Sequence, residues 1–236
     1  MRIIKTQLSV ILFWFLLITA EADWPKFRGS TGQGIWECPG LPLNIENPIK
    51  VWEHQINGGY SGITIKDGKV YTMDRPENKN VERILCFEEK SGELIWEHQY
   101  KANYKGLSYD VGPRASVTIY NDKAFTFGAV GHIHCLDMNN GKVIWTKDSR
   151  EAFGAKRPTW GFSSSPAPWN KSIIYQIGGS SGGYIALDPD TGSKIWSGSD
   201  DPAGYATPAF IKHAGNEIML AWTPENIRGI SPKNGE

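Results

Sequence analysis

The sequence has no excess of either charge and little cysteine. Its 236 residues contain 25 Lys and Arg against 25 Asp and Glu, so the formal net charge is zero. A balanced chain has no electrostatic attraction to nucleic acid or to an anionic membrane, and we expect neither as a partner. The three cysteines, Cys38, Cys86 and Cys135, are never adjacent. Three is an odd number, which allows one disulfide and one free thiol.

A long hydrophobic run is also missing. The apolar run Leu8–Ala20 has 13 residues, which is short for a membrane span. Arg2 and Lys5 precede the run, and Ala20-Glu21-Ala22 follows it with the spacing of a signal-peptidase site. No cysteine follows until Cys38, which argues against a lipoprotein anchor. Residues 1–22 are therefore predicted to be a signal peptide, with an uncleaved anchor as the alternative, and the protein to be periplasmic or extracellular without a stable span after cleavage.

What the chain does contain is Trp, Gly and an internal repeat. The 10 Trp and 26 Gly, together with short alternating segments, favour an all-β fold rich in turns. Four segments align without gaps, and their glycines lie 49, 51 and 43 residues apart. The aligned segments are CFEEKSGELIW (Cys86–Trp96), CLDMNNGKVIW (Cys135–Trp145), ALDPDTGSKIW (Ala186–Trp196) and GISPKNGE (Gly229–Glu236).

Each position of the repeat has a mechanical role. A small residue such as Ala186 allows a strand to pack closely, and the acidic residue two positions later, such as Asp188, accepts hydrogen bonds from turn amides. The pair before and at the glycine, such as Thr191-Gly192, supplies the positive φ angles of a tight hairpin. The final Trp buries a large ring whose indole N–H needs a partner.

A second hairpin lies upstream of each repeat motif. Each unit therefore has four short strands and two turns, and a unit of this kind repeating every 43–51 residues is a propeller blade. Such a sheet cannot bury both faces alone, so the blades are expected to stack around an axis. The upstream hairpins lie in residues 61–74, 116–128, 165–178 and 207–222.

The motif small-x-Asp-x-x-Thr-Gly-x-x-x-Trp, matched at every position by Ala186–Trp196, resembles the pyrroloquinoline-quinone-like (PQQ-like) repeats of exported bacterial β-propellers. The opening Asp23–Gly29, the segment Gly112–Ala115 and the segment Trp160–Pro166 also resemble that family. The resemblance covers essentially all of residues 23–236. It is specific for the fold but not for an activity, because function depends on sites grafted onto a fold.

The family resemblance implies a ring of seven or eight blades, of which this chain supplies about four at about 45 residues each. We therefore expect the chain to be C-terminally incomplete, since its fourth motif stops at Glu236. The predicted organisation is a signal peptide (1–22), an N-terminal lead-in (23–50) and a partial PQQ-like β-propeller (51–236). A strand at Val51–Gln55 is expected to complete the last blade, and open sheet edges near the C-terminal end are expected to promote aggregation.

Some cysteines and histidines suggest a disulfide or a metal site, but they have simpler structural explanations. Cys86 and Cys135 share one repeat position with Ala186, so small buried core residues are predicted rather than a disulfide or a metal site. His132 and His134 share one face of a strand, but no third metal ligand is apparent, and ordinary strand histidines are predicted.

Two further runs resemble parts of a phosphate loop and of a hydrolase active site, but each lacks the neighbouring residues that such a site requires. The run Gly178–Gly183 lacks the Lys-Ser/Thr and the helix of a phosphate loop, and a hairpin is predicted there. The run Ser163–Ser165 lacks the Gly-x-Ser-x-Gly elbow of a hydrolase, so it is predicted only to begin an inner strand.

The loops between blades are the candidate functional region. They span residues 100–113, 150–161 and 199–205 and carry Tyr104 and Tyr109. Aromatic and guanidinium groups that converge on a propeller axis can hold a planar polyanion such as a quinone, by stacking and paired hydrogen bonds. The alternative is that these groups only anchor the loops. The candidate cofactor-binding residues are Asp110, Arg114, Arg157 and Trp160.

Two functions from different classes follow from the resemblance. The favoured one is a non-catalytic binding or scaffolding propeller of the cell envelope, whose partners are envelope proteins or peptides. The alternative is a quinoprotein alcohol or sugar dehydrogenase that uses PQQ and Ca²⁺. The best-known enzymes of that class carry a disulfide between adjacent cysteines over the quinone, and this sequence has no Cys-Cys pair. No cluster of calcium-binding carboxylates or catalytic base can be assigned from the sequence.

Overall fold

A computed structural model describes residues 23–36, 44, 46–77 and 79–236. Residues 1–22 and Cys38, and with them the signal-peptide prediction, lie outside the described residues. The regular secondary structure of the described chain is almost entirely antiparallel β-strand, arranged in four sheets, and in each sheet the strands follow one another in sequence order. The all-β fold of repeated blades is therefore confirmed.

The first two sheets have four strands each. The first consists of β1 (Thr64–Lys66), β2 (Lys69–Asp74), β3 (Val81–Glu88) and β4 (Leu94–Lys101). The second consists of β5 (Thr118–Tyr120), β6 (Lys123–Phe127), β7 (His132–Asp137) and β8 (Val143–Asp148).

The third sheet repeats this plan, and the fourth has three strands among the described residues. The third contains β9 (Ala167–Trp169), β10 (Ser172–Gln176), β11 (Tyr184–Leu187) and β12 (Lys194–Gly198). The fourth contains β13 (Ala209–His213), β14 (Asn216–Trp222) and β15 (Ile227–Ile230). As predicted, residues 178–183 lie within the link between β10 and β11, the second and third strands of their sheet.

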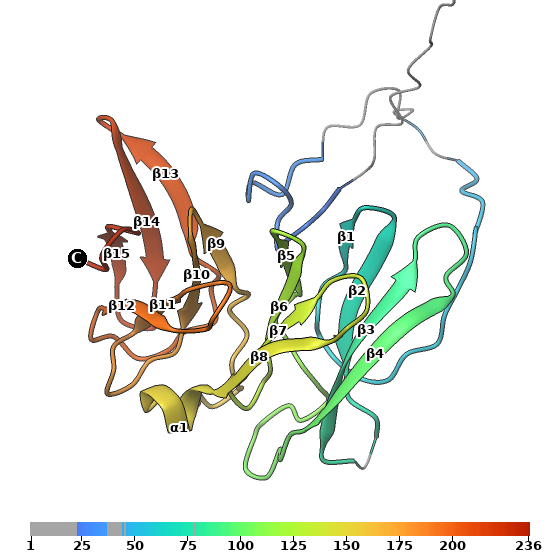
Figure 1. Ribbon diagram of the computed structural model, residues 1–236, viewed down its shortest axis with the longest axis horizontal. Coiled ribbons are helices and arrows are strands. Elements are labelled where there is room, and N and C mark those ends of the chain that lie inside the picture. The colour runs from blue at the N-terminus through green and yellow to red at the C-terminus, as the bar shows by residue number, and fades with distance from the viewer. Residues whose placement is uncertain (1–22, 37–43, 45, 78) are drawn as a thin grey trace, which may run out of the picture.

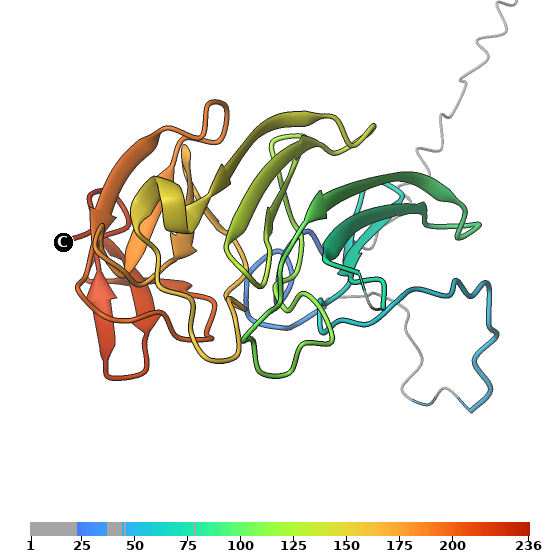
Figure 2. The same ribbon diagram turned by 90° about the horizontal axis from the view of Figure 1, so that it is seen from below.

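The sheets stand side by side in an arc that follows the chain from β1 to β15 (Figure 1), and the view turned by 90° shows the same succession (Figure 2). The short first strands contact one another, β1 with β5 and β5 with β9, so they form the inner side of the arc. Two apolar cores fill the spaces between the first and second sheets and between the second and third. A third core joins the third and fourth sheets.

A tryptophan joins each blade to the next. The indole N–H groups of Trp96, Trp145 and Trp196 donate to the carbonyl oxygens of Met138, Pro189 and Pro232 in the following blade, at 3.0, 3.1 and 3.0 Å. Each ring covers the repeat glycine of that next blade so closely that an added Cβ would approach it to 2.7 Å. The repeat Trp and the repeat Gly are therefore the two halves of one contact between neighbouring blades. The glycines concerned are Gly141, Gly192 and Gly235.

The acidic residue of the repeat organises its own turn, as predicted. Asp188 Oδ1 accepts from the amides of Asp190 and Thr191 at 2.9 and 2.8 Å and from the Thr191 hydroxyl at 3.0 Å. The prediction that the dipeptide Thr191-Gly192 forms a tight hairpin with two positive φ angles is wrong. Only Gly192 has positive φ, at 67°, because a register shift after Ala186 widens the connection between β11 and β12.

Hydroxyl groups link the inner strands of successive blades. Thr64 Oγ1 donates to Val117 O at 2.6 Å, and Thr118 Oγ1 donates to Pro166 O at 2.7 Å. The Ser165 amide continues the series by donating to Thr207 Oγ1 at 2.8 Å. The buried hydroxyls beside the axis thus satisfy backbone groups that no neighbouring strand can reach.

The segment Val51–Gln55 is not paired with any strand among the described residues, so the expectation that it completes the last blade stays a prediction. Trp52 nevertheless acts like the other repeat tryptophans. Its indole N–H donates to Glu89 O at 2.7 Å, and an added Cβ on Gly92 would approach its ring to 2.6 Å. Trp52 therefore docks on the first blade as the end of a preceding repeat, with its strand unpaired.

Cys86 and Cys135 are small core residues, as predicted. Both are free and fully buried, and they face Trp96 and Trp145 across neighbouring strands. Burial raises the pKa of each thiol to about 12, so neither is a ready nucleophile or metal ligand at neutral pH.

A short helix interrupts the β pattern between the second and third blades. α1 (Ser149–Phe153) begins after Asp148, whose carboxylate accepts from the Arg150 amide at 2.9 Å. It ends at Gly154, whose left-handed conformation closes the turn. This helix is too short to cross a bilayer, and no other part of the described chain forms a membrane-spanning helix.

Candidate functional site

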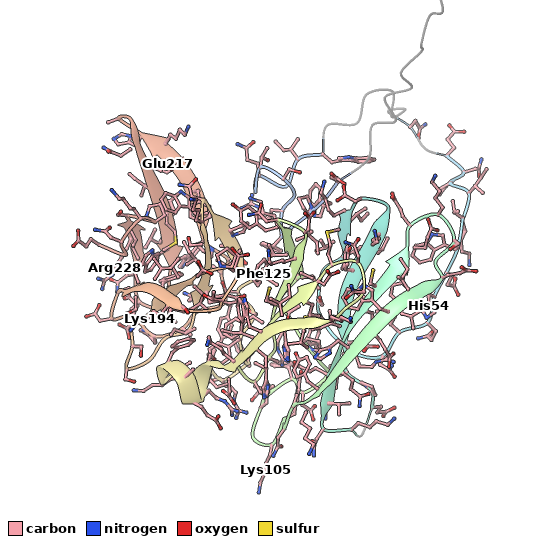
Figure 3. The ribbon with its side chains drawn as sticks, in the orientation of Figure 1. His54, Lys105, Phe125, Lys194, Glu217 and Arg228 are labelled. Carbon is pink, nitrogen blue, oxygen red and sulfur yellow. The ribbon has the colours of Figure 1, made fainter. Side chains whose placement is uncertain are left out.

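The loops between blades gather on one face of the arc and are hydrogen-bonded to one another. Ser108 N donates to Thr159 O at 3.3 Å, and Trp160 N donates to the Tyr205 hydroxyl at 3.4 Å. This loop face lies at the lower edge of the views in Figures 1 and 3, where Lys105 marks the loop after β4. Three consecutive inter-blade loops therefore form one continuous surface.

Each of these loops places one exposed aromatic ring on that surface. The rings of Trp160 and Tyr205 lie 5.1 Å apart between centroids, and Tyr109 meets Trp160 edge-on at 6.2 Å. Tyr109, Trp160 and Tyr205 are 68, 49 and 38% exposed. We call these three residues the aromatic platform. Large apolar rings this exposed, drawn from three separate loops, are typical of a recognition surface.

Arg114 fixes the backbone of the loop that carries Tyr109. Its guanidinium donates to the carbonyl oxygens of Gly112, Tyr109 and Ser108, the last at 3.1 Å. Tyr109 has a φ of 55°, a strained conformation for a bulky residue that persists only where its surroundings impose it. Burial lowers the pKa of Arg114. Its donors are thus used to fix the loop in the shape that presents Tyr109.

A buried carboxylate anchors the same loop to the first two blades. Glu82 in β3 is fully buried and accepts from the hydroxyls of Tyr100 and Tyr104 and from the Ala129 amide, the last at 3.0 Å. Burial, with the neighbouring Glu82 charge, raises the pKa of both tyrosines, so they remain protonated donors. This network fixes the start of the loop that carries Tyr109.

Arg157 lies beside the platform, whereas Asp110 belongs to another part of the surface. Arg157 Nη2 donates to Gly106 O at 3.1 Å and to Lys105 O at 3.4 Å, so it ties the second loop to the first. Asp110 receives a hydrogen bond from Arg75 at its backbone carbonyl. Asp110 also lines a pocket of about 530 Å³, together with Arg75 and Glu77. The structure thus brings Arg114, Arg157 and Trp160 together around the platform and sets Asp110 apart.

The strand histidines belong to a contact between the first two blades. The ring of His134 lies 4.2 Å from Tyr100 and 5.2 Å from His98, and His132 lies 5.4 Å from Tyr100. Burial lowers the pKa of all three histidines, and that of His134 falls to about 3. No set of three or more His, Cys, Asp or Glu side chains with metal-binding geometry occurs within the described part of the chain.

Sequence reasoning missed two residues that shape this face. Tyr205 was only the end of a loop range, yet its ring lies against that of Trp160, tilted by 31°. Glu82 lies in β3 and belongs to no sequence motif that indicates a function. A signal for Tyr205 does exist, because Trp96, Trp145 and Trp196 are each followed by an exposed loop aromatic 9 to 15 residues later. Glu82 had no comparable signal, since its partners come from three separate segments.

Sequence comparison finds a family model and more distant relatives. The model described as outer membrane protein assembly factor BamB (PQQ_2) matches residues 80–236. A 1-butanol dehydrogenase (quinone) of Thauera butanivorans is 27% identical over 177 residues, which are 65% of this chain and 26% of that protein. A quinoprotein ethanol dehydrogenase of Pseudomonas aeruginosa is 27% identical over 179 residues, or 67% of this chain and 27% of that protein. The chain thus spans about a quarter of these relatives.

Solved structures show the same fold at low identity. A quinohemoprotein alcohol dehydrogenase from Pseudomonas putida matches with a TM-score of 0.65 and 13% identity, over 91% of this chain and 39% of that chain. A quinohemoprotein alcohol dehydrogenase from Comamonas testosteroni matches with a TM-score of 0.54 and 15% identity, over 91 and 48% of the two chains. The family match covers more than half of this chain, which therefore belongs to the PQQ-like repeat β-propeller family.

Proposed function

We propose that this chain is part of a non-catalytic binding propeller of the cell envelope, which captures polypeptide partners on its loop face. The aromatic platform is the observation that carries the proposal. Tyr and Trp are enriched at protein interfaces because they combine a large apolar area, few rotatable bonds and a polar group. Three such rings fixed by neighbouring loops give a partner a rigid surface at low entropic cost.

The arginines beside the platform support binding more than cofactor chemistry. A planar tricarboxylate such as PQQ needs cations whose donors are free to face it. Arg114 instead donates to three backbone carbonyls, and Arg157 reaches two carbonyls of the neighbouring loop. The carboxylates of the described residues do not cluster as Ca²⁺ ligands do. Arg157 uses Nη2 alone for these two bonds, so the case against a quinone rests mainly on Arg114 and on the absence of clustered carboxylates among the described residues.

A binding measurement with a defined unfolded chain tests the proposal. The probe is a fluorescently labelled, reduced and carboxymethylated polypeptide, which exposes extended backbone and side chains. We expect saturable binding that Trp160→Ala weakens by about 30-fold, which corresponds to roughly 2 kcal/mol for a central interface residue. Tyr205→Ala is expected to weaken binding in the same direction.

Trp36→Ala is the matched control for this experiment. Trp36 is 47% exposed, close to the 49% of Trp160, but it lies in the N-terminal lead-in. Removing it leaves the binding unchanged if the platform is the site. Equal losses of affinity in Trp36→Ala and Trp160→Ala would indicate non-specific binding to exposed aromatic residues. They would refute the platform as a specific surface.

The quinoprotein dehydrogenase remains the second candidate, because the two relatives at 27% identity carry that activity in their names. Its test is a titration with PQQ, with and without Ca²⁺, followed by tryptophan fluorescence. Saturable quenching that requires Ca²⁺ and is lost in Trp160→Ala would favour the enzyme and would direct further work to Arg114 and Arg157. No quenching at high quinone concentration would favour the binding function.

The proposed cellular location and the proposed domain limits come from the sequence. A signal peptide at residues 1–22, a lead-in at 23–50 and a partial propeller at 51–236 agree with an exported, periplasmic or extracellular protein. Mass spectrometry of the mature N-terminus tests this proposal. A first residue of Asp23 is the expected result, whereas a retained Met1 would contradict it.

A further inference from the structure

The N-terminal lead-in forms a tight loop against the inner strands, away from the loop face. Trp24 exchanges two backbone hydrogen bonds with Ile65, at 2.8 and 3.0 Å, and Pro25 O accepts from Ile119 N at 2.7 Å. Asp23 adds an ion pair with Lys66 at 2.6 Å. In Figure 1 this segment, in blue, lies in the upper half of the view, on the inner side of the arc. It is therefore fixed to the first two blades.

Backbone turns give this loop a defined shape. Gly29 N donates to Lys26 O at 3.0 Å, and Gly34 N donates to Arg28 O at 2.8 Å. Arg28 has a φ of 65°, and an added Cβ on Gly29 would approach the Trp24 ring to 2.8 Å. The direction in which Lys26, Phe27 and Arg28 leave the loop is thus set by the backbone.

A pocket of about 260 Å³ lies between this loop and the third and fourth blades. We call it the N-terminal pocket. Phe27, Phe210 and several prolines give it apolar walls. It is smaller than the roughly 300–1,000 Å³ of a site for a drug-sized ligand, so its occupant must be a small molecule. Its lining residues are Lys26–Arg28, Thr31–Gln33, Pro166–Pro168 and Thr207–Ile211.

The charged side chains that line the N-terminal pocket are both cationic. Lys26 and Arg28 are the charged residues of the lining, and no carboxylate accompanies them. Lys26 is half-buried without an ion pair among the described residues, and burial lowers its pKa. Arg28 donates to Gln33 O at 3.2 Å from one nitrogen. Thr207 Oγ1 accepts from Ser165, so its own hydrogen can be donated to a ligand.

We propose that the N-terminal pocket binds a small organic carboxylate with a flat or compact apolar body. The carboxylate would pair with Lys26 and Arg28 and accept from Thr207, while the body would pack between Phe27 and Phe210. A half-buried ammonium without a counter-charge favours an anionic ligand. The apolar walls favour an organic acid over inorganic phosphate. This site is independent of the aromatic platform.

The test compares charged and neutral ligands of the same shape on the intact protein. Benzoate and benzamide are titrated in parallel by calorimetry, with inorganic phosphate as a third ligand. Benzoate is expected to bind at least tenfold more tightly than benzamide or phosphate. This comparison needs no variant, so a folding defect cannot obscure it.

Substitutions then locate the site. Lys26→Met keeps an apolar stem, removes the charge and is expected to weaken benzoate binding at least tenfold, whereas Lys26→Arg retains most of it. Lys194→Met is the control, since Lys194 lies on an exposed outer strand (Figure 3) and should leave binding unchanged. Equal affinity for benzoate and benzamide, or full affinity in Lys26→Met, would overturn the proposal. If phosphate binds as tightly as benzoate, the proposed contribution of the ligand's apolar body would be wrong.

Discussion

At the scale of single residues, the repeat glycines matter because a tryptophan ring of the preceding blade packs against each of them. Gly141 and Gly68 have almost the same φ, 71 and 70°, so both are strained by any side chain. An added Cβ on Gly141 would come within 2.7 Å of the Trp96 ring, whereas nothing lies within 4 Å of one on Gly68. The two positions separate the cost of backbone strain from the cost of crowding the blade contact.

Gly141→Ala is expected to destabilise the fold by about 3 kcal/mol, because left-handed strain and a displaced Trp96 ring act together. Gly68→Ala is the control and should cost about 1 kcal/mol, from strain alone. Urea unfolding followed by far-UV circular dichroism measures both free energies. Equal losses in the two variants would show that the Trp96–Gly141 contact has no special role.

A second residue-scale prediction concerns His134, which is buried neutral with a pKa of about 3 in the folded protein. In the unfolded chain its pKa is near 6.5. The unfolded state therefore binds more protons below pH 6.5, and stability contributed at neutral pH is lost as the pH falls from 6.5 toward 3. The expected loss is up to about 1.4 kcal/mol per pH unit. His98 and His132, with lowered pKa values, add to the same trend.

The measurement for this prediction is the unfolding free energy as a function of pH between 7 and 4. His134→Phe keeps a ring against Tyr100 and should flatten the slope. His213→Phe is the control, because His213 lies exposed at the end of β13 and should leave the slope intact. Identical slopes for the native protein and His134→Phe would contradict the assignment.

At the scale of elements, blades are joined along their inner strands by hydroxyls and along their outer strands by tryptophans. Thr118 and Thr126 test the inner contact, because both are fully buried in the second sheet. Thr118 Oγ1 donates to Pro166 O in the next blade at 2.7 Å. Thr126 Oγ1, by contrast, has no hydrogen-bond partner among the described residues. The same substitution should therefore lower the stability at Thr118 but not at Thr126.

Thr118→Val is expected to lower the free energy of unfolding by about 1–3 kcal/mol, since it leaves the Pro166 carbonyl buried without a donor. Thr126→Val should be neutral or slightly stabilising, because it removes an unpaired buried hydroxyl. Thermal and urea unfolding of the two variants give the comparison. A loss in Thr126→Val as large as that in Thr118→Val would mean that shape, not hydrogen bonding, decides the effect.

At the scale of the whole molecule, the second and third sheets bury both faces, whereas the fourth sheet buries one face only, against the third. Side chains alternate along β14, so Met219 and Ala221 enter the core with the third blade. Ile218, Leu220 and Trp222 point to the other face, where Trp222 is 64% exposed and lies beside Ile227. In a polypeptide of residues 23–236 this apolar face of the fourth sheet has no cover.

We expect that polypeptide to self-associate through the fourth sheet. Trp222→Lys combined with Ile227→Lys should shift it toward the monomer, because the two charges would have to be desolvated in the contact. Sedimentation velocity at several concentrations measures the association. The control is Ile95→Lys with Ile144→Lys, two partly exposed positions on outer strands of the first two blades. A native monomer at all concentrations would refute the expectation.

Sequence alone determined the features that repeat. The Gly spacing, the Trp positions and the turn carboxylates depend on local geometry, so each copy supported the others and the four-stranded blades could be predicted. The burial of Cys86 and Cys135 followed from the same alignment. The strand expected at Val51–Gln55 stays a prediction, because its partner was assigned to a blade outside this chain and pairing is not a property of the segment itself.

Only the tertiary structure decided what the inter-blade loops do. Arg114 and Arg157 were candidates to hold a cofactor. In the structure Arg114 donates to carbonyls of its own loop, and Arg157 donates to a carbonyl of the neighbouring loop. Tyr205 joined Trp160, and Glu82 joined Tyr100, Tyr104 and Ala129, across distances in sequence that no motif spans. The physical reason is that a loop takes its shape from the groups it meets. Those groups are brought together only when the blades stack.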